Sequence, residues 1–375
     1  MTGPSTRSPQ PAAHAAHGPR LTPHADVRAQ VDAGLAEFLD RTTTTLRRIS
    51  PVADRLLTPL RTFTAGGKRV RAVLLWWGYE LAGGEDRHAI AAAAGSVELL
   101  HAAALVHDDI IDESETRRGR PSVHARFRDA HARTRMAGDS ELYGTSAGII
   151  AGDLCLALSE ELFDSAGFAN SPAARSAHAA LRRDVMLGQF LDVELQAAHI
   201  PREELRTRAD EVLTHKTAQY TVVQPLVLGA SLADADPALL TALADFGLPL
   251  GRAFQMRDDV LGVYGDPSVT GKPAGDDLAQ GKRTILVAEV LDRAQPDEAE
   301  WFESRLGHPE ISADDLGRMT AIMTACGAAR SFEDLIEAET ARALDALDGL
   351  SDRGVSPADV ATLRAFADTL THRRS

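Results

Sequence analysis

An alanine-rich stretch with two acidic residues at its end constrains this chain more than any other feature. Residues 96–119 read SVELLHAAALVHDDIIDESETRRG, an apolar helical pattern that ends in a charged segment and a glycine. Asp108 and Asp112 share one helix face, and His101 falls about 20° from that line. Two carboxylates one turn apart on a buried helix are costly unless a cation neutralises them. The pattern predicts a divalent-metal site with oxygen ligands; a solvated helix end is the alternative.

A second acidic pair makes the metal site the better interpretation. Residues 253–266 read AFQMRDDVLGVYGD, an apolar run that ends in Asp258 and Asp259. Two such pairs predict two carboxylate clusters that face one site for metal ions and a diphosphate. Here the chain resembles the trans-prenyl diphosphate synthases (polyprenyl synthetases), most of all those that make geranylgeranyl diphosphate. The resemblance extends in the right order from about residue 66 to residue 284.

Composition and spacing predict an all-α protein. The chain has 375 residues, 44% of them hydrophobic, which is enough for a substantial core. Alanine and leucine recur at helical spacing, whereas hairpin signals are hard to find. The resemblance implies a single helical bundle around a central cleft, the class I isoprenoid synthase fold, over residues 25–375. Residues 1–24, rich in Pro, Ala and His, are expected to be a disordered tail.

The chain is also expected to contain several long helices separated by two polar stretches. Residues 114–145 are polar and rich in arginine, so most of that span is expected to be loop or short irregular helix. Residues 263–281 carry Gly, Pro and Asp at turn spacing and are expected to form a mobile lid. The main helices are expected over residues 66–84, 146–166, 172–198, 202–231, 237–262 and 281–294.

Charge and cysteine content exclude several classes. A net charge of −14 argues against a nucleic-acid binder, which would present a basic field. Two cysteines, Cys155 and Cys326, give neither a disulfide framework nor zinc spacing, which fits a reducing cytoplasm. No run of 18 apolar residues occurs, so no membrane span is expected.

Lysine usage points to the diphosphate ligands. Of 40 basic residues only four are lysines: Lys68, Lys216, Lys272 and Lys282. An ammonium group is a compact point charge suited to phosphate, and a guanidinium does not replace it freely. These four positions match the diphosphate-binding lysines of the resembled family.

The resemblance also assigns roles to residues around the two acidic pairs. Lys68, Arg71 and His101 match the site for isopentenyl diphosphate, which Arg118 also contacts, and Arg117 contacts the allylic diphosphate. The other matching substrate positions are Gln189, Asp192, Lys216, Thr217, Phe254, Gln255, Lys272 and Lys282. The catalytic set implied is Asp108, Asp112, Asp258, Lys216 and Gln255. The metal ligands implied are Asp108, Asp112, Asp258 and Asp259, with about three Mg²⁺ ions in each active site of a homodimer.

The second acidic motif departs from the family pattern at one position. The family carries a third Asp four residues after the first, where this chain has Gly262. Asp266, eight residues after Asp258, lies about 80° around a continued helix and cannot simply replace it. The metal ion on that side is therefore expected to rely on Asp258, with water and phosphate oxygens completing its shell.

The implied reaction joins an allylic diphosphate to isopentenyl diphosphate. Pyrophosphate leaves, the allylic cation is attacked by the second substrate's double bond, and loss of a proton gives a chain five carbons longer. Ala103 and Ala104 lie five and four residues before Asp108, where an aromatic side chain would stop growth early. Small residues there favour geranylgeranyl diphosphate over farnesyl diphosphate, and longer polyprenyl products remain an alternative.

Two other functions compete with this interpretation. A class I terpene cyclase also ionises an allylic diphosphate on an Asp-rich helix, but it needs no isopentenyl site and its usual second motif is absent near Asp258. A catalytically silent regulatory subunit is disfavoured by the two acidic pairs and the four lysines, and is weakly favoured by Gly262.

Overall fold

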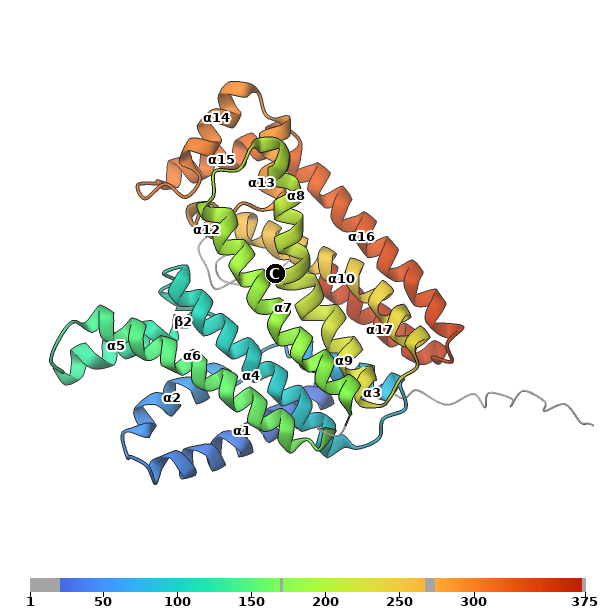
Figure 1. The fold of residues 1–375 in the computed structure, drawn as a ribbon. Coiled ribbons are helices and arrows are strands. Elements are labelled where there is room, and N and C mark those ends of the chain that lie inside the picture. The colour runs from blue at the N-terminus through green and yellow to red at the C-terminus, as the bar shows by residue number, and fades with distance from the viewer. Residues whose placement is uncertain (1–20, 169–170, 267–273, 373–375) are drawn as a thin grey trace, which may run out of the picture.

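The helix with the first acidic pair, α4 (Arg87–Ile111), is a central element of the fold (Figure 1). The computed structural model describes residues 21–168, 171–266 and 274–372. The Asp86 carboxylate caps α4 by accepting hydrogen bonds from the backbone of His88 and Ala89, at 3.0 and 2.9 Å. Its alanines let neighbouring helices approach closely, and the helix ends at the acidic pair.

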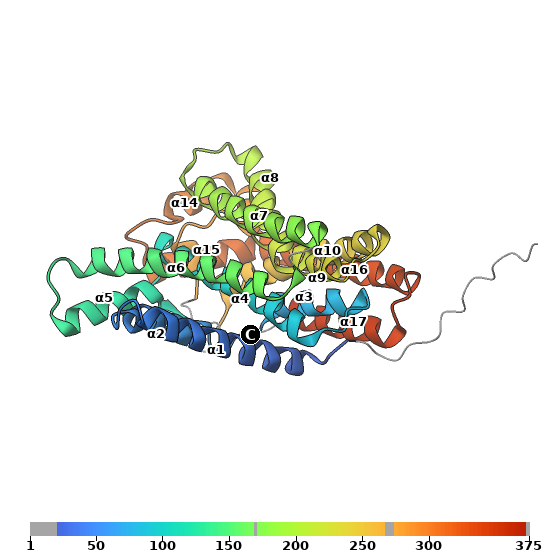
Figure 2. The same ribbon diagram turned by 60° about the horizontal axis from the view of Figure 1, so that its bottom comes forward.

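The remaining described elements are almost all helical, as predicted. Their order along the chain is α1 (His24–Arg47), α2 (Ala53–Thr64), α3 (Val70–Leu81), then α4, β1 (Thr116–Arg117), β2 (Arg120–Pro121), α5 (Val123–Thr134), α6 (Ser140–Ser165), α7 (Pro172–Ala197), α8 (Arg202–Val212), the π-helix η2 (Leu213–Val223), α9 (Gln224–Leu232), α10 (Pro237–Tyr264), α12 (Asp276–Ala279), α13 (Ile285–Arg293), α14 (Pro296–Arg305), α15 (Ala313–Ala325), α16 (Ala328–Ser351) and α17 (Pro357–Thr371). In Figure 2, α1 and α2 form one outer layer, α3 and α4 lie in the middle, and α7 and α8 lie on the opposite side.

Three groups of buried apolar side chains hold these helices together. The largest joins α1, α3 and α4 to α9, the first half of α10 and the C-terminal helices. The second joins the end of α10 to α8 and α13–α16, and the third joins α2, α4, α5 and α6. The acidic pair on α10 lies in the half of that helix that belongs to the second group, whereas α4 belongs to the first and third.

The chain enters the fold slightly before the predicted boundary at residue 24. Leu21 and Thr22 are buried; the Leu21 backbone donates to Asp359 on α17, and the Thr22 backbone donates to Glu80 on α3 at 2.8 Å. The expected tail is therefore too long by residues 21–24, since Leu21 and Thr22 have buried acidic partners and α1 begins at His24. Residues 1–20 lie outside the described part of the chain.

The span from 114 to 145 contains more regular structure than predicted. It contains a small hairpin, all of α5 and the first turns of α6. The hairpin turn is formed by Arg118 and Gly119, both with positive φ, which suits a two-residue connection. Polar α5 is helical because Val123 and Phe127, four residues apart, are buried against α2, α4 and α6.

Two helices in the described chain are long and apolar enough to cross a membrane, judged by length and composition alone. In α4, 78% of the most apolar window is buried inside the protein, so its apolar character serves the core. In α6, only 39% is buried, and Leu142, Ile149 and Ile150 are exposed.

A buried histidine on α7 should make stability depend on pH. His178 stacks on Phe163 with ring centroids 3.7 Å apart, and burial lowers its pKa to about 3. The unfolded chain therefore binds this proton first, so the group costs stability as pH falls below about 6.5. We expect His178→Phe to reduce the loss of stability between pH 7 and pH 5 by about 1–2 kcal/mol.

Urea unfolding of both proteins at the two pH values measures this difference. His88→Phe, at an exposed position of α4, is the matched control and should leave the pH dependence unchanged. If His178→Phe leaves it unchanged as well, His178 is not the group responsible.

Candidate active site

A cavity of about 960 Å³ opens between α4, the start of α3, α7, η2, α10 and the segment 277–285. Its wall brings together most of the residues selected from the sequence: Lys68, Arg71, His101, Ala104, Asp108, Arg117, Arg118, Gln189, Asp192, Lys216, Thr217, Phe254, Gln255, Asp258, Asp259 and Lys282. Lys272 lies outside the described residues. Asp108 of the first acidic pair therefore shares one cavity with Asp258 and Asp259, which are about 150 residues away in sequence, whereas Asp112 is not on the cavity wall and lies beside Lys282.

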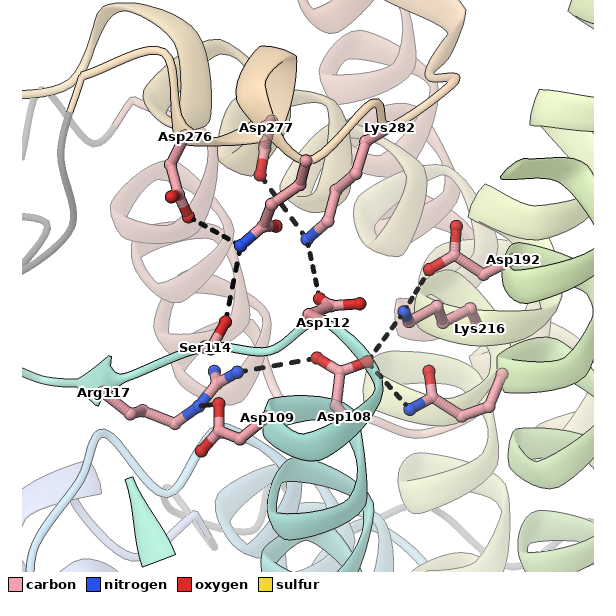
Figure 3. A network of polar contacts seen from close by, with 12 residues as sticks. Asp108, Asp109, Asp112, Ser114, Arg117, Asp192, Lys216, Asp276, Asp277 and Lys282 are labelled. Atoms are coloured by element: carbon pink, nitrogen blue, oxygen red, sulfur yellow. Dashed lines mark hydrogen bonds and ion pairs between the residues drawn. The ribbon is translucent and has the colours of Figure 1, made fainter. Parts of the chain in front are cut away.

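Asp108 lies at the centre of a network of cations and amides (Figure 3). Its carboxylate accepts hydrogen bonds from Lys216 Nζ and Gln189 Nε2, each at 3.1 Å, and Arg117 Nη2 lies 3.5 Å away. Burial alone would raise the pKa of Asp108, but Lys216, Lys282 and Arg117 outweigh it and hold the pKa below its usual range. The carboxylate therefore stays ionised and able to bind a cation.

Lys216 reaches Asp108 because its backbone lies close to α7. A Cβ atom at Gly188 would fall 2.6 Å from the Lys216 Cα, so only glycine permits this approach. Lys216 Nζ also donates to Asp192 on α7, at 2.5 Å. Lys216 lies in the π-helix η2, a local irregularity that is frequent at functional sites.

Lys282 connects the two acidic regions. Its Nζ lies 3.5 Å from Asp112 Oδ2 and 3.5 Å from Asp277 Oδ1 (Figure 3). Burial would lower the pKa of Lys282, but Asp277, Asp112 and Asp108 raise it above its usual value. A fixed positive charge thus lies between the carboxylates of the first motif and the chain that follows the second.

The second acidic pair on α10 divides into one buried and one exposed residue. Asp258 is exposed at the cavity, whereas Asp259 is buried and accepts a hydrogen bond from Gln255 Nε2 at 2.7 Å. Burial, and then the nearby Asp277 and Asp258, raise the pKa of Asp259 well above its ordinary value. Asp258 is therefore better placed than Asp259 to meet a ligand in the cavity.

Another part of the cavity lining, called the basic wall below, is strongly basic. Lys68, Arg71 and Arg118 line it, together with a partly buried His101 whose Nδ1 has no hydrogen-bond partner among the described residues. Burial lowers the pKa of His101 well below its usual value, and Arg71 and Arg118 lower it further, so the ring is neutral. Arg71 donates to Thr221 at 2.7 Å, which fixes the guanidinium. The wall can hold a polyanion in spite of the chain's negative charge.

The carboxylates fit divalent ions, although ammonium groups lie among them. In the described parts of the chain, no group of three or more His, Cys, Asp or Glu side chains is already arranged around a metal position. Instead, Lys216 and Lys282 lie next to Asp108 and Asp112. The Asp112 side chain is only 6% exposed, and within the described part of the chain its Oδ2 accepts no hydrogen bond, so this buried oxygen is open to a cation. Oxygen donors of this kind are what Mg²⁺ prefers, and phosphate oxygens can draw the lysines away.

Comparison with known proteins agrees with this chemistry. The family model for polyprenyl synthetase matches residues 53–323. The chain belongs to the polyprenyl synthetase family.

Individual members of the family are also similar to this chain in sequence and in structure. The geranylgeranyl diphosphate synthase of Sulfolobus acidocaldarius is 30% identical over 83% of this chain and 88% of its own length. That of Mycobacterium tuberculosis is 34% identical over 76% of each chain. The crystal structure of Corynebacterium glutamicum geranylgeranyl pyrophosphate synthase, complexed with isoprenyl diphosphate and magnesium, has a TM-score of 0.88 and 38% identity, and covers 94% of this chain and 100% of its own.

This polyprenyl synthetase is therefore a trans-prenyltransferase with the class I isoprenoid synthase fold, as its sequence indicated. Members of the family use Mg²⁺, which agrees with the carboxylates found at the cavity.

The two alanines proposed to set product length do not lie together. Ala104 is on the cavity wall, whereas Ala103 is fully buried against Leu60, Phe127 and Ala151 in the third core group. One residue corresponds to 100° on a helix, and this rotation turns Ala103 toward α5 and α6. Of the pair, only Ala104 is placed to meet a growing chain.

Sequence reasoning missed the residues that support the loop carrying Lys68 on the basic wall. Arg69 has a left-handed backbone (φ 53°), and its guanidinium donates to Asp32 Oδ1 at 2.8 Å and to Glu98 Oε2 at 3.0 Å. His24 Nε2 lies 2.9 Å from the Lys68 carbonyl oxygen. These contacts hold the loop between Lys68 and Arg71. Glu98 could have indicated the role of Arg69, because an acidic side chain within the apolar run of α4 requires a buried cation as its partner.

Proposed function

We propose that this polyprenyl synthetase makes geranylgeranyl diphosphate by adding isopentenyl diphosphate to allylic diphosphates, as a cytoplasmic homodimer with three Mg²⁺ ions in each active site. The observation that carries the proposal is that Asp108 on α4 and Asp258 on α10 line one cavity with Lys216 and Lys282. Acidic and basic side chains from distant segments of the chain line this cavity, and the proposed reaction needs no nucleophilic side chain.

The allylic diphosphate is proposed to bind between the two acidic helices. Asp108, Asp112 and Asp258 would hold Mg²⁺, which when bound neutralises negative charge on the diphosphate as it leaves. Lys216 and Lys282 would then turn from carboxylates to phosphate oxygens, with Arg117 beside them. Fixed cations that stabilise developing charge in this way are a major source of rate acceleration.

The basic wall is proposed to hold the second substrate. Lys68, Arg71 and Arg118 would bind the diphosphate of isopentenyl diphosphate. His101, which is neutral, lines the same wall without adding a charge.

The proposed reaction begins when the allylic C1–O bond breaks and its electron pair leaves with pyrophosphate. The double bond of isopentenyl diphosphate then supplies electrons to C1, and a proton is lost to the pyrophosphate, which leaves a new double bond. The apolar part of the cavity excludes water from the cation.

Product length is proposed from the size of the cavity wall. Ala104 leaves room beside Asp108, and Leu105, Val185 and Tyr220 line the same cavity. Relatives named for geranylgeranyl diphosphate support twenty carbons, although relatives named for farnesyl and geranylfarnesyl products also occur. The small residue on α4 favours a product longer than farnesyl diphosphate.

Exposed apolar side chains support the proposed homodimer. On α7, Leu187 and Phe190 are 52% and 63% exposed, and on α6, Leu142 and Ile150 are 68% and 57% exposed. Large apolar residues gathered on exposed helix faces are typical of protein interfaces. Light scattering of the purified protein should give twice the mass of one chain, and the mass of one chain would refute the dimer.

One assay tests the proposed function. The purified protein is incubated with Mg²⁺, isopentenyl diphosphate and, in separate reactions, dimethylallyl, geranyl or farnesyl diphosphate, and the products are separated by chain length. We expect geranylgeranyl diphosphate from each primer. Cyclic hydrocarbons would identify a terpene cyclase, a different chain length would overturn the product assignment, and no turnover without a partner protein would identify a regulatory subunit.

A further inference from the structure

The second acidic motif lacks a carboxylate where helical spacing calls for one. Asp108 and Asp112 are four residues apart on α4, but the residue four after Asp258 on α10 is Gly262. A helix places residues four apart on the same face, so an acid at 262 would lie next to Asp258. The chain thus has a complete i, i+4 acidic pair on α4 and only the first half of such a pair on α10.

The space next to Gly262 contains the carboxylate of another residue. A Cβ atom at position 262 would lie 1.8 Å from Asp277 Oδ2 and 2.5 Å from its Cγ. These separations are far below van der Waals contact, so no larger residue fits at 262 while Asp277 keeps this position. The glycine and the inward carboxylate therefore depend on each other.

Asp277 is held at this position by the chain around it. It lies on the short helix α12, and its backbone carbonyl accepts a hydrogen bond from the Lys282 backbone at 2.9 Å. Its side-chain Oδ1 lies 3.5 Å from Lys282 Nζ, the same ammonium that lies 3.5 Å from Asp112 (Figure 3). Asp277 is therefore linked to Asp112 through the Lys282 ammonium, and it also lines the cavity.

We propose that Asp277 takes the place of the missing acid at 262, and that with Asp258 it forms the carboxylate pair for the divalent cation on the α10 side. The proposal rests on the proposed function, because that function requires a cation there. A carboxylate from the following segment, and not from α10 itself, completes the second cluster. The cation site on this side then depends on the position of α12.

The test measures cation binding directly. Mn²⁺ replaces Mg²⁺ and inorganic pyrophosphate replaces the substrate diphosphates, and free Mn²⁺ is counted by electron paramagnetic resonance. We expect Asp277→Asn to weaken one class of Mn²⁺ site at least tenfold and to leave the sites of the first motif unchanged. Asp276→Asn is the matched control, because Asp276 lies on the same short helix but accepts a hydrogen bond from Gln280 at 3.1 Å. It should bind Mn²⁺ as the unmodified protein does.

A reciprocal exchange separates lost folding from lost binding. Gly262→Asp alone should lower the melting temperature, because the new side chain collides with Asp277. The double variant Gly262→Asp with Asp277→Gly should restore the lost Mn²⁺ site to within about threefold of the original affinity. Wild-type Mn²⁺ binding by Asp277→Asn, or an equal loss in Asp276→Asn, would overturn the proposal.

These outcomes are distinct from a failure of the proposed function. If the unmodified protein forms no prenyl product from any primer, the function is refuted whatever the variants bind. If it forms product and Asp277→Asn binds Mn²⁺ normally, only the role of Asp277 is refuted.

Discussion

Asp108→Asn should lower kcat for prenyl transfer at least about 10³-fold while the protein remains folded. The substitution keeps the volume of the side chain but removes the charge that meets Lys216, Gln189 and Arg117. Without that charge, the cations of the site lose their common acidic partner and Mg²⁺ loses a ligand. Steady-state kinetics over a range of Mg²⁺ concentrations measure the effect, with a thermal melt to verify folding.

Asp245→Asn is the control for this experiment, because Asp245 is an exposed carboxylate on α10. Its turnover should match that of the unmodified enzyme. Near-normal turnover by a folded Asp108→Asn protein would remove the basis for assigning the metal site to α4.

Ala104→Phe should shorten the product from twenty carbons to fifteen. Ala104 lies one turn before Asp108 on the wall of the cavity, so a phenyl ring there would occupy space that the growing chain needs. The distribution of chain lengths formed from dimethylallyl diphosphate measures the change. Turnover with the shorter primers should persist, because the diphosphate ligands are not altered.

Ala103→Phe provides a neighbouring comparison. Ala103 is fully buried against Leu60, Phe127 and Ala151, so an aromatic ring should overpack that core and reduce stability by about 1–3 kcal/mol. Product length should not change. A product shift caused by Ala103→Phe and not by Ala104→Phe would place the floor of the chain site on the other face of α4.

The sequence predicted the parts of the site that depend on regular helices. Asp108 and Ala104 are placed by the 3.6-residue period of an apolar helix, which is readable from a single chain. Lys216 was selected because lysine is rare here, and the structure places it 3.1 Å from Asp108, whereas its role as a diphosphate ligand stays a prediction. The assignment of the two acidic motifs to one site came from the recurrence of the pattern and from the family resemblance, since helical spacing contains no information on tertiary distance.

Other features depend on packing that local patterns do not describe. The π-helix η2 follows α8 without a break, so the expected helix over 202–231 gives no sign of it. Helix α5 was missed because its polar sequence has only a narrow apolar face, and burial of Phe127 decides its structure. The proximity of Asp277 to Gly262 could not be predicted either, because a glycine does not indicate which distant side chain occupies the space beside it.

The lysines between the acidic helices have a consequence for the whole catalytic cycle. Lys216 and Lys282 each lie beside carboxylates of this polyprenyl synthetase, so the acidic helices can approach without mutual repulsion before any substrate arrives. In the proposed function, an arriving diphosphate lets each ammonium exchange an aspartate for a phosphate oxygen, and departure of pyrophosphate reverses the exchange. Lys216 and Lys282 would thus serve as built-in counter-ions that neutralise the aspartates again after each turnover.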